Sequence, residues 1–171
     1  LAADLYADRD PEKRRKTLKK LFLEHSDWDA YDELKAACED GDTDWHSLYE
    51  EFEQRFSDTN RQRLIRLYIH EDDLDAAFAA VTASENLSWF KQYRDPVATV
   101  DPIAYFEAYR EQLIPFAAGD TGRRHYRNII DHLEEMQPLV PAERFEEFLA
   151  FLKETHSNRP AFLDELRQAG F

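Results

Sequence analysis

The chain has 171 residues, of which 43% are hydrophobic and 13% aromatic, a composition that suffices for a packed core and argues against a disordered chain. Its 36 Asp and Glu side chains against 22 Lys and Arg give a formal net charge of -14. Because this charge repels polyanions, it disfavours broad binding to nucleic acid or to an anionic membrane surface, although a local basic patch stays possible.

Helical periodicity predicts three helices in the first sixty residues. Asp10 followed by Pro11 is the pattern of an N-cap carboxylate with a proline in the first turn, where the missing amide hydrogen costs nothing. A helix should therefore start there, and a partner helix should end at Gly41. The expected helices cover residues 10–25, 28–41 and, from Thr43 or Asp44, about 44–58.

The segment 18–30 recurs 46 positions later as residues 64–76. In both copies an apolar helix ends, an acidic turn follows, and a second helix opens with the pattern Asp-x-Asp-Ala, beginning at Asp27 and at Asp73. Repeats with a period of 20 to 50 residues are typical of stacked helical hairpins. We therefore expect an antiparallel helix hairpin at each copy.

Between residues 86 and 100 the helical pattern is interrupted, so this segment is the expected position of a bend. Asn86 can cap a short helix, and Asp95 followed by Pro96 should end it. Four more helices are expected downstream: from Asp101 to Gly119, through Tyr126 to Pro138, from Pro141 onward, and from Pro160 to Gly170.

The predicted fold class is all-α, because no stretch alternates apolar and polar residues at strand length. We expect a superhelical array of antiparallel helix hairpins, of the tetratricopeptide-like or HEAT-like kind, in which the end helices act as caps. No Gly/Ser linker divides the chain, so residues 1–171 are predicted to form a single helical-repeat domain. Since the chain begins at Leu1 and not at Met, we expect a fragment of a longer protein.

Six cations lie within eight residues near the start of this acidic chain. One interpretation is a contact with nucleic-acid phosphates or with an acidic partner. The favoured interpretation is pairing within the molecule, with Asp4, Asp8, Asp10, Glu12 and neighbouring acidic helices. The six cations are Lys13, Arg14, Arg15, Lys16, Lys19 and Lys20.

A second cluster, of Arg123, Arg124 and Arg127, lies at the start of a predicted helix. Cations at this end oppose the helix dipole, so the cluster needs a compensating anion. An anionic ligand is one candidate, and a facing acidic helix is the favoured one.

We predict no metal site, no cofactor and no catalytic residue. His125 and His132 share a helical face beside Asp131, but a tetrahedral zinc site needs further converging ligands. Cys38 and His46 do not have a recognised ligand spacing, and the chain lacks a Gly-x-Ser-x-Gly or a Gly-rich phosphate loop.

Four aromatic residues exceed what a thin array of helix pairs needs, and they either anchor a bound peptide or, by the favoured interpretation, fill the core between helices. They are Trp45, Trp89, Phe90 and Tyr93.

The second half of the chain contains a distinctive set of motifs: Tyr105, Tyr109, Arg123-Arg124-x-Tyr126, Leu133, Met136, Phe148-Leu149-x-x-Leu152, His156 and Arg159-Pro160-Ala161-Phe162-Leu163-Asp164-Glu165-Leu166. With these residues, the chain over about residues 60–171 resembles the C-terminal region of prokaryotic SWIM-type zinc-finger proteins, and residues 64–80 are similar to the helical hairpin of that region. The resemblance implies a Cys-x-Cys and Cys-x-His zinc module upstream, a tetratricopeptide-like tail, and association of the whole molecule with nucleic acid or protein. With one cysteine the chain has no zinc finger, so no zinc ligand can be transferred.

These observations predict a non-catalytic scaffold for protein–protein interaction with an unidentified protein partner. The alternative is a nucleic-acid-binding accessory module that uses the basic N-terminal helix and the Arg123–Arg127 cluster. A third possibility is a hydrolase or lyase in which histidine and carboxylates converge between helices.

The expected location is the cytoplasm, without membrane association. A lone cysteine gives no sign of an oxidising compartment, no apolar run approaches the roughly 20 residues that span a bilayer, and no signal peptide is evident. Arg outnumbers Lys about two to one, which together with the acidic surface predicts a halophilic protein.

Overall fold

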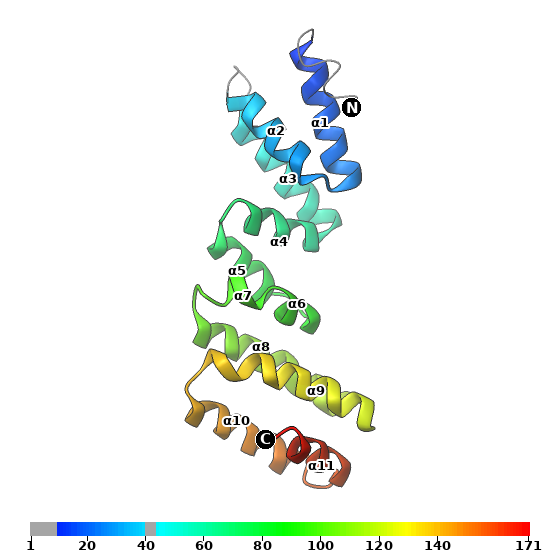
Figure 1. Cartoon of the computed structure of the whole chain (residues 1–171), viewed down its shortest axis with the longest axis vertical. Coiled ribbons are helices and arrows are strands. Elements are labelled where there is room, and N and C mark those ends of the chain that lie inside the picture. Colours follow the sequence, from blue (N-terminus) through cyan, green and yellow to red (C-terminus); the bar gives the residue numbers. More distant parts are fainter. Residues whose placement is uncertain (1–9, 40–43) are drawn as a thin grey trace. The chain divides into compact units, whose positions relative to one another are not determined.

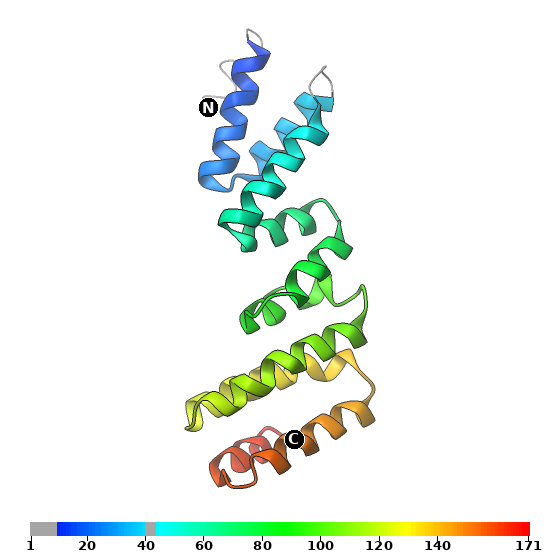
Figure 2. The ribbon, with the colours of Figure 1, turned by 180° about the vertical axis from the view of Figure 1, so that it is seen from behind.

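The computed structural model describes residues 10–39 and 44–171, and within them the chain forms eleven α-helices and no strand. Its contacts divide it into two compact units, residues 1–59 and residues 60–171. Figures 1 and 2 show the helices of each unit from opposite sides. The all-α prediction is confirmed for the described residues, and the single-domain prediction stays a prediction.

The first unit contains α1 (Pro11–His25), α2 (Trp28–Glu39) and α3 (Trp45–Thr59). As predicted, Asp10 caps α1, where its side chain accepts a hydrogen bond of 3.1 Å from the Lys13 amide, and Pro11 occupies the first turn. The expected end at Gly41 and start at Thr43 lie outside the described residues.

Aromatic rings make up the core of the first unit. The Phe22 ring is fully buried, and its centroid lies 4.7 Å from Tyr31, 5.0 Å from Phe52 and 5.8 Å from Phe56. Tilted and edge-on ring pairs at such distances stabilise a core beyond the effect of burial alone. The three helices therefore contribute to one aromatic cluster.

The second unit contains eight helices whose buried apolar side chains form one continuous cluster, from Ile65 to Leu166. The helices are α4 (Arg61–His70), α5 (Leu74–Thr82), α6 (Leu87–Gln92), α7 (Arg94–Val97), α8 (Pro102–Gly119), α9 (Arg123–Met136), α10 (Ala142–Thr155) and α11 (Pro160–Gln168), with a 3₁₀ turn at Gln137–Leu139. Helix α9 packs against both α8 and α11.

The two copies of the sequence repeat form helix hairpins, α1 with α2 and α4 with α5, in which the second helix runs back alongside the first (Figures 1 and 2). The Asp27 carboxylate caps α2 by accepting a 3.0 Å hydrogen bond from the Ala30 amide. Asp73 caps α5 in the same way, with 3.1 Å to the Ala76 amide. The two capping residues are 46 positions apart, so the two copies of the sequence repeat also share the hydrogen bond that caps their second helix.

The turns of the two hairpins also match in backbone geometry. Ser26 has a φ of 56° and Asp72 a φ of 58°, and among the described residues these are the only non-glycine residues with a positive φ. Such left-handed conformations are uncommon outside glycine. Their recurrence at the same displacement of 46 positions indicates one turn type used twice.

The segment 86–100 differs in detail from the prediction. Asn86 does cap α6, since its side chain accepts a hydrogen bond from the Ser88 amide at 3.1 Å. However, α6 ends at Gln92, and Pro96 lies inside the short helix α7 instead of terminating a helix. Proline is tolerated in the first turn because the amide hydrogen it lacks would have no partner in the helix.

The downstream boundaries agree closely with the expectation. Asp101 caps α8, which runs through Pro115 to Gly119. Pro141 is the N-cap residue of α10, and Pro160 is the first residue of α11. Among the described helices, none combines the length and the apolar character that a bilayer crossing requires.

Candidate functional site

At least four of the six cations near the start of the chain form ion pairs within the first unit. The partners lie on α1, α2 and α3 themselves, as expected from pairing within the molecule. The side chains are largely exposed, so each pair contributes little to stability. The pairs are Arg14–Glu33 at 3.4 Å, Lys16–Glu12 at 3.0 Å, Lys19–Glu51 at 2.6 Å and Lys20–Glu24 at 3.9 Å.

The other two cations of this cluster are Lys13, which is exposed, and Arg15, which is half-buried. Asp4 and Asp8, expected as further partners, lie outside the described residues. The partners of the four ion pairs lie on three different helices, so these cations are neutralised by several neighbouring carboxylates.

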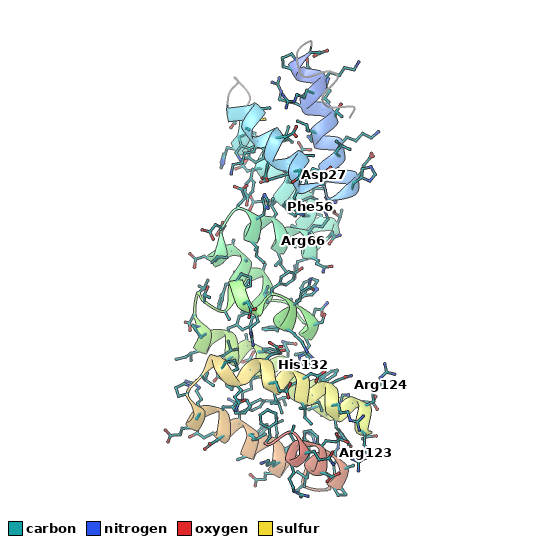
Figure 3. The ribbon with its side chains drawn as sticks, in the orientation of Figure 1. Asp27, Phe56, Arg66, Arg123, Arg124 and His132 are labelled. Atoms are coloured by element: carbon teal, nitrogen blue, oxygen red, sulfur yellow. The ribbon has the colours of Figure 1, made fainter. Side chains whose placement is uncertain are left out.

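The second cluster is split by the structure. Arg123 donates to Glu165 at 2.6 Å and to Asp164 at 3.1 Å, and Arg127 donates to Glu165 at 3.1 Å, so both join α9 to α11. Arg123 and then Arg127 lower the pKa of the Glu165 carboxyl group. This carboxylate is the compensating anion that the helix start needs. Arg124 points away from α11 (Figure 3) and has no partner among the described residues.

The motif at the end of the chain, residues 159–166, has a structural role that the sequence did not reveal. Arg159 donates to the backbone oxygens of Ala117, Ala118 and Asp120 at 2.9–3.2 Å, at the carboxyl end of α8. Its charge is favourable there because of the helix dipole. Together with Glu165, this residue fastens α11 to α8 and α9.

The second unit contains an open cavity of about 890 Å³, which we call the His132 pocket. Its walls are Arg61 at the start of α4, residues 83–89 between α5 and α6, Phe116 of α8 and His132 of α9. Figure 3 shows His132 in the middle of the second unit. The volume lies in the range of small-molecule and peptide sites.

His132 is held by a buried tyrosine. Its Nδ1 lies 2.6 Å from the hydroxyl of Tyr109, whose pKa is raised by burial, so the hydroxyl keeps its hydrogen at neutral pH. Burial, and then the charge of Lys91, lower the pKa of His132 to about 4. The imidazole is therefore neutral at pH 7.

This arrangement determines which ring nitrogen of His132 carries the hydrogen. The Tyr109 hydroxyl has no other hydrogen-bond partner in the described part of the chain, so its hydrogen is satisfied only by donation to an unprotonated Nδ1. A neutral imidazole then carries its hydrogen on Nε2. His132, which lines the pocket, thus carries an N–H donor on Nε2.

Two further N–H donors line the pocket. Arg61 is exposed and Trp89 is half-buried, and neither side chain makes a hydrogen bond to another described residue. By contrast, the Ser88 hydroxyl donates a hydrogen bond of 2.6 Å to Oδ1 of Asn86. Among the ring and guanidinium donors of the pocket, those without a hydrogen bond to another described residue are therefore on Arg61, Trp89 and His132.

The remaining residues singled out in the sequence, three aromatic residues and Cys38, pack against other side chains of the protein. Phe90 and Tyr93 are buried in the core, Trp45 packs 5.3 Å from the Tyr31 ring, and Cys38 is buried. These positions agree with the favoured interpretation of the aromatic residues, apart from Trp89 in the pocket wall.

His125 and His132 both face Phe116, with ring centroids 4.7 Å and 5.9 Å from it. The shared face predicted from their spacing is thus confirmed. His125 is buried, and its Nε2 has no partner among the described residues. No group of three or more potential metal ligands gathers in residues 10–39 and 44–171.

A smaller cavity of about 440 Å³ lies between α8 and α10. Its charges are largely paired: Glu107 accepts from Arg144 at 2.7 Å and from Arg110 at 3.2 Å. The Arg110 guanidinium lies 5.4 Å from the Phe148 ring. Since its cations already have anions, this cavity is less suited to a charged ligand than the His132 pocket.

Comparison with known proteins gives no relative: no family model matches the chain, and neither a curated protein nor a solved structure does. The chain is all-helical in its described residues, and no family is identified. The resemblance to SWIM-type zinc-finger proteins therefore stays a prediction.

Proposed function

We propose that the chain is a non-catalytic helical-repeat scaffold that binds a protein partner, as the tail of a SWIM-type zinc-finger protein. In this proposal the hairpins form a superhelical array, and their exposed faces carry the partner. The proposal extends to a cytoplasmic location in a salt-rich cell, which the acidic composition supports.

The observation that carries the proposal is the repeated hairpin. Residues 26–30 and 72–76 share a left-handed turn residue and an aspartate cap at the same displacement. Repeats of this kind bury their apolar faces against neighbours and present extended surfaces, which are used for binding in helical arrays. In the second unit, one core joins the repeated hairpin to the helices that follow it.

The properties of His132 support the non-catalytic part of the proposal. A general base works best with a pKa near the operating pH, whereas the pKa of His132 is about 4. Its Nδ1 accepts a hydrogen bond from a tyrosine hydroxyl and does not contact a carboxylate of the described residues. A histidine–carboxylate pair for a hydrolase or lyase is therefore less well supported.

The nucleic-acid alternative is favoured by one observation, the outward position of Arg124 (Figure 3). The ion pairs of the other cations weigh against it, because phosphate would have to displace carboxylates. We rank it second.

Site-specific photocrosslinking tests the proposal. A photoreactive residue is placed at one exposed position in each of several helices of the full chain, for example at Ser88, Arg124 and Glu147. The scaffold proposal predicts that one protein from the native cell is captured from more than one of these positions. It is contradicted if no position captures a protein above the level seen without light.

A further inference from the structure

We propose that the His132 pocket binds an acidic side chain, Asp or Glu, of a peptide segment of the protein partner, together with an apolar side chain next to it. This inference rests on the proposed scaffold function and names the chemistry of its partner.

The first argument is the set of donors. Arg61, Trp89 and His132 line one cavity, and the guanidinium of Arg61, the indole N–H of Trp89 and the Nε2–H of His132 make no hydrogen bond to another described residue. They come from α4, α6 and α9, so only the folded unit brings them together. A ligand that excludes water from this cavity must supply acceptors, because a buried donor without an acceptor is costly.

The second argument is the identity of the acceptor. A carboxylate can accept two parallel hydrogen bonds from a guanidinium, and such charge-assisted bonds are about twice as strong as neutral ones. Arg61 has no carboxylate partner among the described residues, unlike Arg123 and Arg144 of the same unit. An amide carbonyl would use the same donors without the charge, so it should bind more weakly.

The third argument concerns the apolar neighbour. Leu87, Phe116 and the ring of Trp89 are half-buried and belong to the wall of the pocket, together with Arg61 and His132. An apolar side chain would cover their exposed parts and gain free energy from burial. The cavity of about 890 Å³ lies within the range of small-molecule sites, so it has room for more than a single side chain.

Charges near the pocket allow an acidic ligand despite the net charge of the chain. The positive charge of Lys91, on α6, lowers the pKa of His132, and the negative charge of Asp131 raises it. Glu85 is exposed in the wall and makes no hydrogen bond to the three donors. Among these four charged side chains, the cations Arg61 and Lys91 equal the anions Glu85 and Asp131 in number, unlike the charges of the whole chain.

The test compares two capped tetrapeptides, acetyl-Gly-Leu-Glu-Gly-amide and its Gln isostere, by titration into the full chain. Binding is followed by calorimetry and by the ¹H–¹⁵N signal of the Trp89 indole. We expect the Glu peptide to shift this signal and to bind about tenfold more tightly than the Gln peptide. Arg61→Gln should reduce this preference to less than about twofold, because it removes the charged donor.

Arg124→Gln is the matched control, since it removes an exposed arginine outside the pocket and should leave the preference unchanged. His132→Phe, which keeps the ring volume, should weaken both peptides. The proposal is overturned if the Trp89 signal does not move up to about 10 mM peptide, or if the Glu and Gln peptides bind wild type equally.

The outcome is separable from the test of the scaffold function. If photocrosslinking still captures a partner but Arg61→Gln leaves the captured amount unchanged, only the pocket inference is wrong. If no partner is captured although the Glu peptide binds as described, the scaffold proposal fails and the pocket chemistry stands.

Discussion

Truncation of Phe90 should unfold the pocket wall and lower the stability of the second unit strongly. Phe90 is fully buried in the six-residue helix α6. Its ring centroid lies 5.0 Å from Tyr109 and 5.5 Å from Tyr105, and the Tyr105 hydroxyl donates to its backbone oxygen at 2.7 Å. So short a helix has little stability of its own and depends on this packing.

The expected size follows from the side chain that is removed. Phe90→Ala loses the transfer free energy of the ring and leaves a cavity, which together cost about 3–5 kcal/mol in a close-packed core. Phe90→Leu keeps most of the volume and should cost about 1.5 kcal/mol or less. Lys91→Ala, at the exposed neighbouring position, should change stability by about 0.5 kcal/mol or less.

Urea unfolding of the three variants measures these differences, and peptide titration reports the pocket. Phe90→Ala should also abolish the Trp89 signal shift, since Phe90 positions the helix that carries Trp89. The reasoning is refuted if Phe90→Ala costs less than about 1 kcal/mol or is indistinguishable from Lys91→Ala, because α6 would then not depend on the shared core.

Three further predictions concern charge. Replacing residues 13–16 by Glu should lower affinity for duplex DNA or RNA and flatten its salt dependence if the nucleic-acid alternative is correct, whereas equal binding by both proteins across a salt series eliminates that alternative. Raising KCl from about 0.1 M to about 2 M should raise the melting temperature, because salt screens the repulsion that a net charge of -14 creates; a melting temperature that falls contradicts the halophilic prediction. The folded-state pKa of His132 is about 4, below its ordinary value of 6.5, so the folded protein binds fewer protons at this group. The contribution of His132 to stability is therefore present above pH 6.5 and lost as the pH falls toward 4, and His132→Phe should flatten the slope of unfolding free energy in this window; identical slopes contradict this account.

The sequence predicted the parts of the fold that depend on neighbouring residues. Asp10, Asn86 and Asp101 were identified as caps because a cap needs only a side chain and the amides two or three residues further on. The repeat was also visible, since its two copies differ by a fixed displacement. Pro96 was misplaced because proline both ends helices and fits their first turn.

The candidate site could not be predicted in the same way. Trp89 was named as a possible peptide anchor and His132 was weighed as a metal ligand, but Arg61 was not singled out. The three residues are separated by 28 and 43 positions, so their meeting in one pocket had no signal in the sequence. Likewise, Glu165 compensates Arg123 and Arg127 from about 40 positions away. Their contacts depend on how the hairpins pack, which periodicity alone does not determine.

A comparison of the two aspartate caps tests the central claim, that one hairpin is used twice, most directly. Asp27→Ala and Asp73→Ala remove the acceptors of the Ala30 and Ala76 amides, and Asp27→Asn and Asp73→Asn retain an acceptor. Hydrogen exchange at the two amides reports each hairpin separately. The account predicts that each Ala variant loses about 1 kcal/mol of local stability relative to its Asn counterpart. A loss at only one position, or at neither, would contradict it.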